Sequence, residues 1–301
     1  MLTDRRSVNK VMAVLTVSNL TFCYDADDQP VLDGAALELP GGSSVGLLGA
    51  NGSGKSTFLG AITNSIKGHC EAAIDISPDA RGPIGYATQD AALYAHLSVR
   101  ENLEHAARLT TRRWNVSDLI ERAVEDYGLG DFTGKLARDI SGGQARIAHL
   151  ACAFAHQPSI RLLDEPTTAL DFQTREKLIN LINGWRAEGV ATLVTAHYPE
   201  DIEELCEELV VLVDGKTTPL GRVDDHLLAM GVSATLTRGG SHTEVSVHSA
   251  TLRQLIDSSA ASGVDIDDEF DSISVRPPRL RDLLQRDPTL RSAIPSQDTP
   301  K

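Results

Sequence analysis

The sequence lacks a long hydrophobic run and a leading apolar segment. A membrane-spanning helix needs about 18 or more mostly apolar residues, and no stretch of this chain approaches that length. The first ten residues carry charges but no apolar run long enough for a signal peptide. We therefore expect a cytoplasmic protein that lies at a membrane only where another protein holds it there.

Cysteine is scarce, and the cysteines that are present stand far apart. None forms a C-x-x-C pair, and no histidine lies nearby at the spacing of metal ligands. Disulfide frameworks and zinc sites need paired or clustered cysteines, and cytosolic proteins keep isolated thiols reduced. We expect four free, mostly buried thiols, at Cys23, Cys70, Cys152 and Cys206.

Positive charge is in the minority, with 28 Lys and Arg against 42 Asp and Glu and a formal net charge of −14. Proteins that bind nucleic acids neutralise phosphates with clustered Lys and Arg, and anionic membrane surfaces attract basic segments. The balance argues against nucleic acid as the main partner and against an anionic membrane surface as the sole one. The apolar fraction of 41% is ordinary for a globular chain.

What the sequence does contain is an alternation of strand-like and helical segments. The apolar–polar alternation from Val14 to Phe22 is typical of a half-buried strand. Such alternation of elements predicts an α/β fold with a mainly parallel core sheet. Buried strands are expected at 44–48, 160–163 and 191–195, and helical segments at 55–66, 97–136 and 173–187.

The pattern changes near Gly215, where shorter segments begin. Their order predicts a small accessory domain of strands and helices. The last residues, which include two prolines, are expected to form a loose tail. The expected elements are a hairpin at 234–238 and 243–248, helices at 251–259 and 279–285, and a strand at 272–275.

Gly49–Ser56 reads Gly-Ala-Asn-Gly-Ser-Gly-Lys-Ser, a complete match to the phosphate-loop (Walker A) pattern. The expected strand before it and helix after it are the context that this motif requires. Glycines allow backbone N–H groups to close around phosphate oxygens, and the helix start adds the positive end of its dipole. Lys55 is predicted to neutralise the β and γ phosphates, and the Ser56 hydroxyl to bind Mg²⁺. The alternative is an ordinary glycine-rich turn.

Two carboxylates, Asp164 and Glu165, end the apolar strand expected at 160–163. The first can hold Mg²⁺ through water, and the second can polarise an attacking water. Such pairs are common at strand ends, so the motif gains its meaning from the preceding phosphate loop. Arg161 interrupts the apolar strand, and we expect its side chain to reach an edge or to find a partner.

Ser141-Gly-Gly-Gln144 is the motif that distinguishes one family among the proteins that contain a phosphate loop. Together with the phosphate loop and Asp164-Glu165-Pro166, it resembles the nucleotide-binding domain of ATP-binding cassette (ABC) transporters. The resemblance runs from about Ala13 to Gly221, with every motif in family order. It implies ATP and Mg²⁺ as cofactors.

Single positions also match the family pattern. Tyr24 matches the aromatic residue that stacks on adenine, and Gln89 matches the glutamine that contacts Mg²⁺ and faces the membrane partner. His197 matches the switch histidine after the last core strand, and Ala169–Asp171 matches the loop that crosses the dimer interface. Taken alone, Tyr24 could cover a core edge, and His197 could be a solvated residue at a helix N-terminus.

The resemblance implies three sets of site residues. The catalytic set is Glu165, His197, Gln89 and Lys55. The nucleotide-binding set is Tyr24, Gly49, Asn51, Gly52, Ser53, Gly54, Lys55, Ser56, Thr57, Ser141, Gly142, Gly143 and Gln144. The metal-binding set is Ser56, Gln89 and Asp164.

The implied fold is a P-loop NTPase of the ABC type, with a mainly parallel core sheet, an antiparallel β subdomain and a helical subdomain. A small α+β C-terminal domain follows it. The expected divisions are a tail at 1–12, the nucleotide-binding domain at 13–221 with its helical subdomain at about 90–140, the accessory domain at 222–290 and a tail at 291–301.

Two positions depart from the family pattern. Ala145-Arg146-Ile147 stands where relatives carry a run of Arg or Lys, and Thr88 stands where relatives often have Pro. Neither position contacts nucleotide in the family, so the departures put regulation or partner fit in doubt more than catalysis.

Two segments, Leu93–Leu103 and His197–Cys206, resemble ATPases of drug- and peptide-efflux systems. The implied function is the ATP-hydrolysing subunit of an exporter, held at the inner face of the cell membrane by separate membrane-spanning permease subunits. The resemblance also implies a second nucleotide-binding subunit in the assembled exporter. Each ATP would lie between the phosphate loop of one subunit and Ser141–Gly143 of the other. The alternatives are an importer ATPase, a soluble ABC ATPase of translation or DNA maintenance, and a nucleotide sensor that does not hydrolyse ATP.

Overall fold

The computed structural model describes most of the chain in eight ranges. They are residues 12–25, 28–110, 115–230, 232–238, 241–247, 272–276, 279–287 and 290–294. The helix expected at 251–259 lies outside them. Within these ranges, no helix has both the length and the apolar character that a membrane crossing requires.

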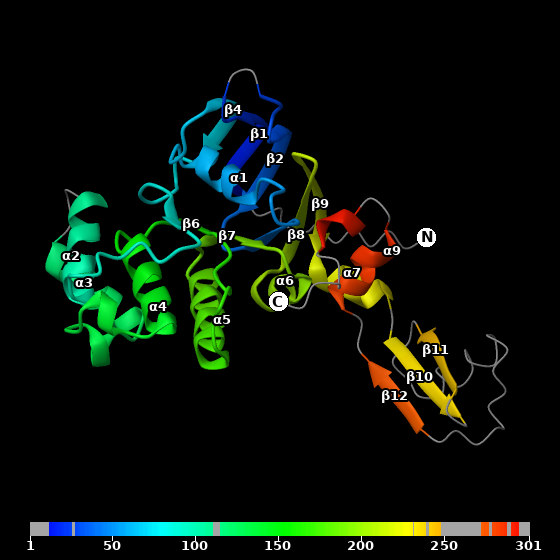
Figure 1. Cartoon of the computed structure of the whole chain (residues 1–301). Coiled ribbons are helices and arrows are strands. Elements are labelled where there is room, and N and C mark those ends of the chain that lie inside the picture. Colours follow the sequence, from blue (N-terminus) through cyan, green and yellow to red (C-terminus); the bar gives the residue numbers. More distant parts are fainter. Residues whose placement is uncertain are drawn as a thin grey trace, which may run out of the picture.

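A six-stranded sheet forms the centre of the molecule, with strand order β5-β6-β7-β3-β8-β9 (Figure 1). All neighbouring strands are parallel except β8 and β9, which are antiparallel. The mainly parallel core sheet that the sequence predicts is therefore confirmed. Its strands are β3 (Ser44–Leu48), β5 (Gly85–Ala87), β6 (Ile160–Leu163), β7 (Ala191–Ala196), β8 (Glu208–Val213) and β9 (Lys216–Arg222).

Both faces of this sheet are buried, which explains why its inner strands read as continuous apolar runs. Successive side chains of a strand point to opposite faces. Leu47 packs in one hydrophobic cluster with α1, and Leu48 packs in another with α4, α5 and α6. The covering helices are α1 (Lys55–Ile62), α4 (Gly142–Ala153), α5 (Phe172–Ala187) and α6 (Pro199–Leu205).

A three-stranded antiparallel sheet with order β2-β1-β4 packs over α1 (Figure 1). It comprises β1 (Ala13–Cys23), β2 (Leu32–Pro40) and β4 (His69–Ile76). The inward residues of β1 are Leu15, Val17, Leu20 and Phe22. The spacing changes after Val17 because the pairing register shifts between Val17 and Leu20.

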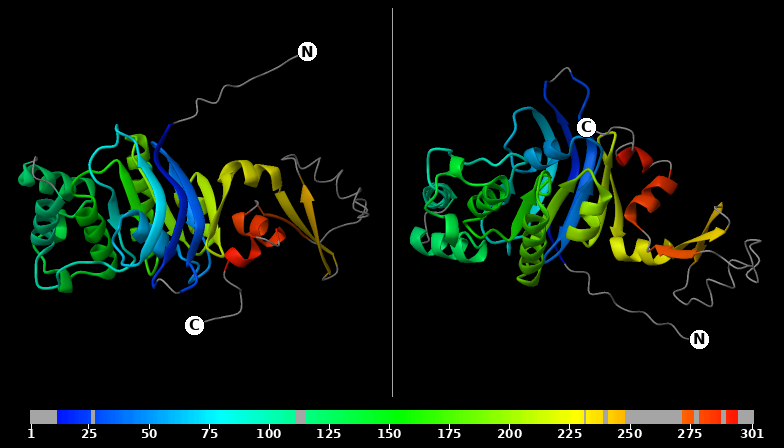
Figure 2. Two further views of the ribbon diagram at one scale, coloured as in Figure 1. Left: turned by 90° about the horizontal axis from the view of Figure 1, so that it is seen from above. Right: turned by 60° about the horizontal axis from the view of Figure 1, so that its bottom comes forward.

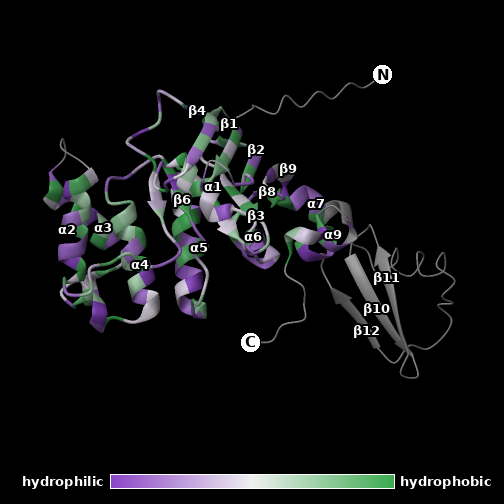
Figure 3. Cartoon of the chain, turned by 45° about the horizontal axis from the view of Figure 1, so that its top comes forward, coloured by the Kyte–Doolittle hydropathy of each residue, from purple (hydrophilic) through white to green (hydrophobic). Residues whose placement is uncertain are grey.

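A group of helices lies at one end of the molecule, and the last elements of the chain lie at the opposite end (Figure 2). The helical end contains α2 (Val99–Thr110), α3 (Val116–Asp126), η1 (Gly130–Phe132), η2 (Ala137–Asp139) and α4. Hydrophilic and hydrophobic residues alternate along α5 (Figure 3), which buries Leu178, Ile182 and Trp185 against the core.

The C-terminal region contains α7 (Val223–Met230), β10 (Val232–Arg238), β11 (Ser241–Val247), β12 (Ser272–Arg276), α9 (Leu280–Arg286) and η3 (Arg291–Ala293). The three strands form an antiparallel sheet with order β11-β10-β12.

The chain then returns to the core of the molecule. Leu280, Leu284 and Ala293 are fully buried in the same cluster as Leu205 of α6 and Leu209 of β8. Residues 291–294, expected in a loose tail, thus pack on the core, and the domain boundaries stay predictions.

Candidate active site

Four predicted site segments follow four neighbouring parallel strands. The phosphate loop follows β3, Gln89 follows β5, Asp164–Glu165 follows β6 and His197 follows β7. The carboxyl ends of parallel strands meet at one edge of a sheet, which is where α/β folds bind ligands. The fold therefore brings together residues that lie far apart in the sequence.

The conformation of the phosphate loop depends on its glycines. Gly52 has a φ of 80° and Gly54 a φ of 102°, in the region that favours glycine. A Cβ atom at Gly49 would lie 2.5 Å from the Ser53 Oγ and 2.8 Å from the Leu212 carbonyl oxygen. A side chain at Gly49 would displace the loop, and one at Gly52 or Gly54 would strain its backbone.

The loop and the start of α1 leave polar groups without partners. No side chain caps the N-terminus of α1, which begins at Lys55. The Ser53 Oγ is buried and has no hydrogen-bond partner. The first N–H groups of a helix lack intrahelical acceptors and attract anions, so this end of α1 fits a phosphate group.

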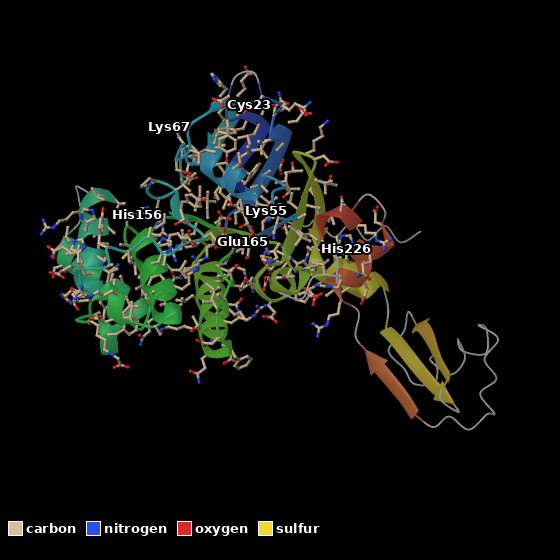
Figure 4. The ribbon with its side chains drawn as sticks, viewed as in Figure 1. Cys23, Lys55, Lys67, His156, Glu165 and His226 are labelled. Carbon is tan, nitrogen blue, oxygen red and sulfur yellow. The ribbon has the colours of Figure 1, made fainter. Side chains whose placement is uncertain are left out.

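Lys55 lies inside the site, with a side chain only 4% exposed. Its Nζ donates to the carbonyl oxygens of Gly49 at 2.9 Å and Ala50 at 3.2 Å. The same atom lies 3.4 Å from the Glu165 Oε1, and Figure 4 shows these two side chains close together at the centre of the molecule. The buried ammonium thus has a carboxylate as its partner.

The Glu165 carboxylate is the point on which the site converges. Its Oε2 lies 3.4 Å from the Gln89 Nε2, 3.3 Å from the His197 Nδ1 and 3.5 Å from the Thr168 Oγ1. Glu165 also has a φ of 42°, which is uncommon outside glycine. Strained backbone of this kind clusters at functional sites, because the surrounding structure must hold it there.

Two residues that the sequence analysis missed hold Asp164. The Thr195 Oγ1 donates to the Asp164 Oδ1 at 2.7 Å and accepts the Glu165 backbone N–H at 2.8 Å. The Tyr86 hydroxyl donates to the Asp164 Oδ2 at 3.3 Å, and burial together with Asp164 raises the Tyr86 pKa above its usual value. The available signal for Thr195 was a hydroxyl residue near the end of an apolar strand.

Ser56, Gln89 and Asp164 supply the side-chain oxygen atoms that Mg²⁺ prefers. Ser56 is exposed at the first turn of α1, whereas Asp164 is buried at the end of β6. The chemistry of this donor set therefore suits a magnesium ion.

Tyr24 lies beside the first turn of α1 and is half-exposed. Its hydroxyl is 3.0 Å from the Thr57 Oγ1, and its ring meets the Phe22 ring edge-on at 5.2 Å between centroids. The ring therefore stands next to the phosphate loop with much of its surface open.

Ser141–Gly143 forms the N-terminus of α4, away from α1 (Figures 1 and 2). The Ser141 Oγ accepts the Gln144 N–H at 3.2 Å, and the Gln144 side chain accepts the Ser141 N–H at 3.1 Å. A Cβ at Gly143 would lie 2.4 Å from the Thr174 Oγ1, but one at Gly142 would meet nothing within 4 Å. One chain thus does not bring this motif onto its own phosphate loop.

Comparison with known families gives a match over residues 32–168 to the family described as ABC transporter. The uncharacterized ABC transporter ATP-binding protein YhaQ of Bacillus subtilis is 30% identical over 218 residues, which cover 70% of this chain and 72% of YhaQ. The human phospholipid-transporting ATPase ABCA7 is 34% identical over 216 residues, and the molybdenum import ATP-binding protein ModC of Thiobacillus denitrificans is 31% identical over 202 residues. The matches cover 69% and 64% of this chain, but only 10% of ABCA7 and 56% of ModC.

Solved structures give the same result. An ATP-binding subunit of an ABC transporter superposes with a TM-score of 0.61 at 26% identity, covering 70% of this chain and 91% of that subunit. A dimeric ATP-binding cassette bound to ADP and Pi superposes with a TM-score of 0.59 at 25% identity, covering 68% of this chain and 98% of that cassette. The P-loop NTPase fold of the ABC type is therefore confirmed, and the chain belongs to the ABC transporter family.

Proposed function

We propose that this chain hydrolyses ATP at the edge formed by β3, β5, β6 and β7, with Glu165 as the general base. The observation that carries the proposal is the convergence of Lys55, Gln89 and His197 on the Glu165 carboxylate. This carboxylate lies beside a helix N-terminus that no side chain caps. An acceptor for the proton of water and a site for phosphate are thus adjacent.

In this mechanism, the phosphate loop and Lys55 bind the β and γ phosphates. Lys55 now lies against Glu165, so bound phosphates would compete for its ammonium and leave the carboxylate available to water. Glu165 then accepts a proton from the attacking water, and Gln89 and His197 orient the γ-phosphate and that water. Mg²⁺ held by Ser56, Gln89 and Asp164 would neutralise charge on the phosphates.

We also propose that two copies, or this chain and a related subunit, enclose two ATP molecules. Each ATP would lie between one phosphate loop and Ser141–Gly143 of the other subunit. Gly142 supports this arrangement because it is exposed and a Cβ atom there would meet nothing. The fold of one chain does not require glycine at this position, whereas close approach of a partner's ligand would.

Tyr24 is the proposed contact for the adenine ring, since it stands beside Thr57 with half of its surface exposed. Stacking on the adenine would cover this open ring and leave the hydroxyl bonded to α1.

We propose membrane-spanning permease subunits as partners, which would hold the chain at the inner face of the cell membrane. Export is favoured by Leu93–Leu103 and His197–Cys206, the segments that resemble efflux ATPases, and by the similarity to ABCA7. Import is the second candidate because ModC is similar at 31% identity. Drugs or peptides are the proposed substrates.

Replacing Lys55 with Ala tests the nucleotide site. The variant removes the cation that would neutralise the β and γ phosphates, so we expect loss of ATP binding or of hydrolysis. Equilibrium ATP binding and phosphate release are measured on the purified proteins, with the exposed Lys67→Ala as a control. Near-normal turnover by Lys55→Ala would exclude the proposed site.

Direction is tested in a strain that lacks this chain. An exporter predicts increased sensitivity to drugs or peptides, restored by the wild-type chain but not by Lys55→Ala. Unchanged sensitivity with a loss of nutrient uptake would favour the importer.

A further inference from the structure

Arg146 of α4 makes an extensive set of hydrogen bonds that the proposed mechanism does not yet use. It lies one and a half turns beyond Ser141 and is only 6% exposed. Its guanidinium donates to five backbone carbonyl oxygens, those of Thr88 at 2.7 Å, Gln89 at 2.6 Å, Asp164 at 3.0 Å, Glu165 at 3.1 Å and Pro166 at 3.3 Å.

This set accounts for the whole hydrogen-bonding capacity of the side chain. A guanidinium has five N–H donors in a rigid plane and no acceptor. Five carbonyl oxygens receive them here, and within the described ranges no carboxylate lies within 4.0 Å of this cation. Burying a charged group without hydrogen-bond partners costs free energy. The fold is therefore stable only if the five carbonyl oxygens keep their positions around the guanidinium.

The five carbonyls belong to two loops that carry site residues. One is the loop after β5, which holds Gln89, and the other is the loop after β6, which holds Glu165. The backbone carbonyl oxygens of Gln89 and Glu165 both accept hydrogen bonds from Arg146. The side chains of the same two residues also contact each other, with the Gln89 Nε2 3.4 Å from the Glu165 Oε2. Because the guanidinium is planar and rigid, it fixes the distance between the two loops.

We propose that Arg146 is a positioning residue that fastens the helix of Ser141 to the loops of Gln89 and Glu165. This inference rests on the proposed function, in which Ser141 contacts the partner's ATP while Gln89 and Glu165 act on the chain's own ATP. Movement of α4 when the partner's nucleotide binds would then pass directly to the catalytic carboxylate. Arg146 itself touches no substrate.

The test compares Arg146→Gln and Arg146→Lys with Arg161→Gln. Arg161 is equally buried at 5% exposure, but it donates to the Pro158 carbonyl oxygen and the Tyr127 hydroxyl, which lie outside both loops. ATP turnover, KM and thermal unfolding are measured on the full chain at a temperature where all three variants are folded.

We expect Arg146→Gln to lower kcat by about 10- to 100-fold with KM for ATP within a few-fold of the wild type, because small displacements of reacting groups have effects of this size. Arg146→Lys keeps the charge and three donors, so it should recover part of the loss. Arg161→Gln should lower Tm and leave kcat close to the wild type.

Equal kcat values for Arg146→Gln and Arg161→Gln, both near that of an active wild type, would show that Arg146 only stabilises the fold. Should Arg146→Gln fail to fold, Arg146→Lys decides the question, since a wild-type kcat there would also overturn the positioning role. An inactive wild-type chain would instead overturn the proposed function, and this inference with it.

Discussion

Arg161 lies within the core strand β6, where the flanking residues are apolar. Its guanidinium stands 4.4 Å from the Trp185 ring centroid and 5.2 Å from that of Phe154. It also donates to the Tyr127 hydroxyl at 3.4 Å, and burial raises the Tyr127 pKa to about 12. Aromatic faces attract a desolvated cation, so the partner that the sequence analysis expected for Arg161 consists mainly of rings.

His149 is a second buried polar residue, and its burial affects its protonation. It lies one turn after Arg146 on α4 and is 4% exposed, and its buried Nδ1 has no hydrogen-bond partner. Burial, together with the positive charge of Arg146, lowers the His149 pKa to about 4. The imidazole is therefore neutral in the folded protein at neutral pH.

We predict that this histidine makes the protein less stable in mild acid. The unfolded chain protonates His149 near its ordinary pKa of about 6.5, whereas the folded protein does so only near 4. Between these values the unfolded state binds more protons, so the free energy of unfolding falls as the pH falls from about 6.5 to 4. A shift of this size corresponds to about 3 kcal/mol.

The measurement is denaturant unfolding at several pH values for the wild type, His149→Gln and the exposed His69→Gln. His149→Gln should lose the corresponding part of the pH dependence, whatever its stability at neutral pH, and His69→Gln should retain it. Identical pH profiles for wild type and His149→Gln would contradict the predicted titration.

At the scale of elements, the strands of the core were predictable, whereas the contacts of α9 with the core were not. Apolar runs identify β3, β6 and β7 because both faces of the sheet are covered. The helix expected at 279–285 is present as α9, but the sequence places it in an accessory domain. Its contacts with α6 join residues more than seventy positions apart, so no local pattern could reveal them.

The candidate site likewise contains residues that the sequence predicts and residues that it does not. Lys55 and Glu165 were predictable because each stands in a motif whose spacing reflects a fixed backbone path. Thr195, Tyr86 and Arg146 were not, because they act on backbone or carboxylate groups of other loops. Such roles depend on which strands become neighbours, which the sequence does not state residue by residue.

We predict that a chain ending at residue 221 is destabilised. It would lose Leu280 and Leu284, both fully buried against the core, which contribute about 2 kcal/mol each. It would also lose the ion pairs of Arg279 with Glu203, at 3.0 Å, and of Arg281 with Glu200, at 2.8 Å. Because α6 begins two residues after His197, we expect weaker ATP hydrolysis as well as a lower Tm.

The matched control replaces residues 232–276 with a flexible linker and keeps α7 and α9, which pack beside each other. Thermal unfolding should place this variant close to the full chain and the 221-residue fragment well below it. A fragment that melts with the full chain would mean that α9 adds little to the cassette.

At the scale of the whole molecule, the two motifs that we propose to bind ATP lie in different parts of the fold. Lys55 begins α1 beneath the antiparallel sheet, whereas Ser141 caps the N-terminus of α4 among the helices at one end (Figure 1). In the proposed arrangement each chain contributes one half of each of two ATP sites, so two chains complete both sites. ATP hydrolysis would then be linked to dimerisation, and a variant that cannot hydrolyse ATP should accumulate as the ATP-bound dimer.

Gel filtration of Glu165→Gln with and without ATP, combined with a phosphate-release assay, tests this account most directly. The variant keeps the shape of the side chain and removes the proton acceptor, so turnover should fall by roughly two or more orders of magnitude. ATP should still bind and should shift the protein from monomer to dimer. Ser141→Arg in the same chain should abolish the shift, whereas Ser117→Arg, at the exposed N-terminal turn of α3, should not. Wild-type turnover by Glu165→Gln, or an ATP-dependent dimer that Ser141→Arg leaves intact, would contradict the account.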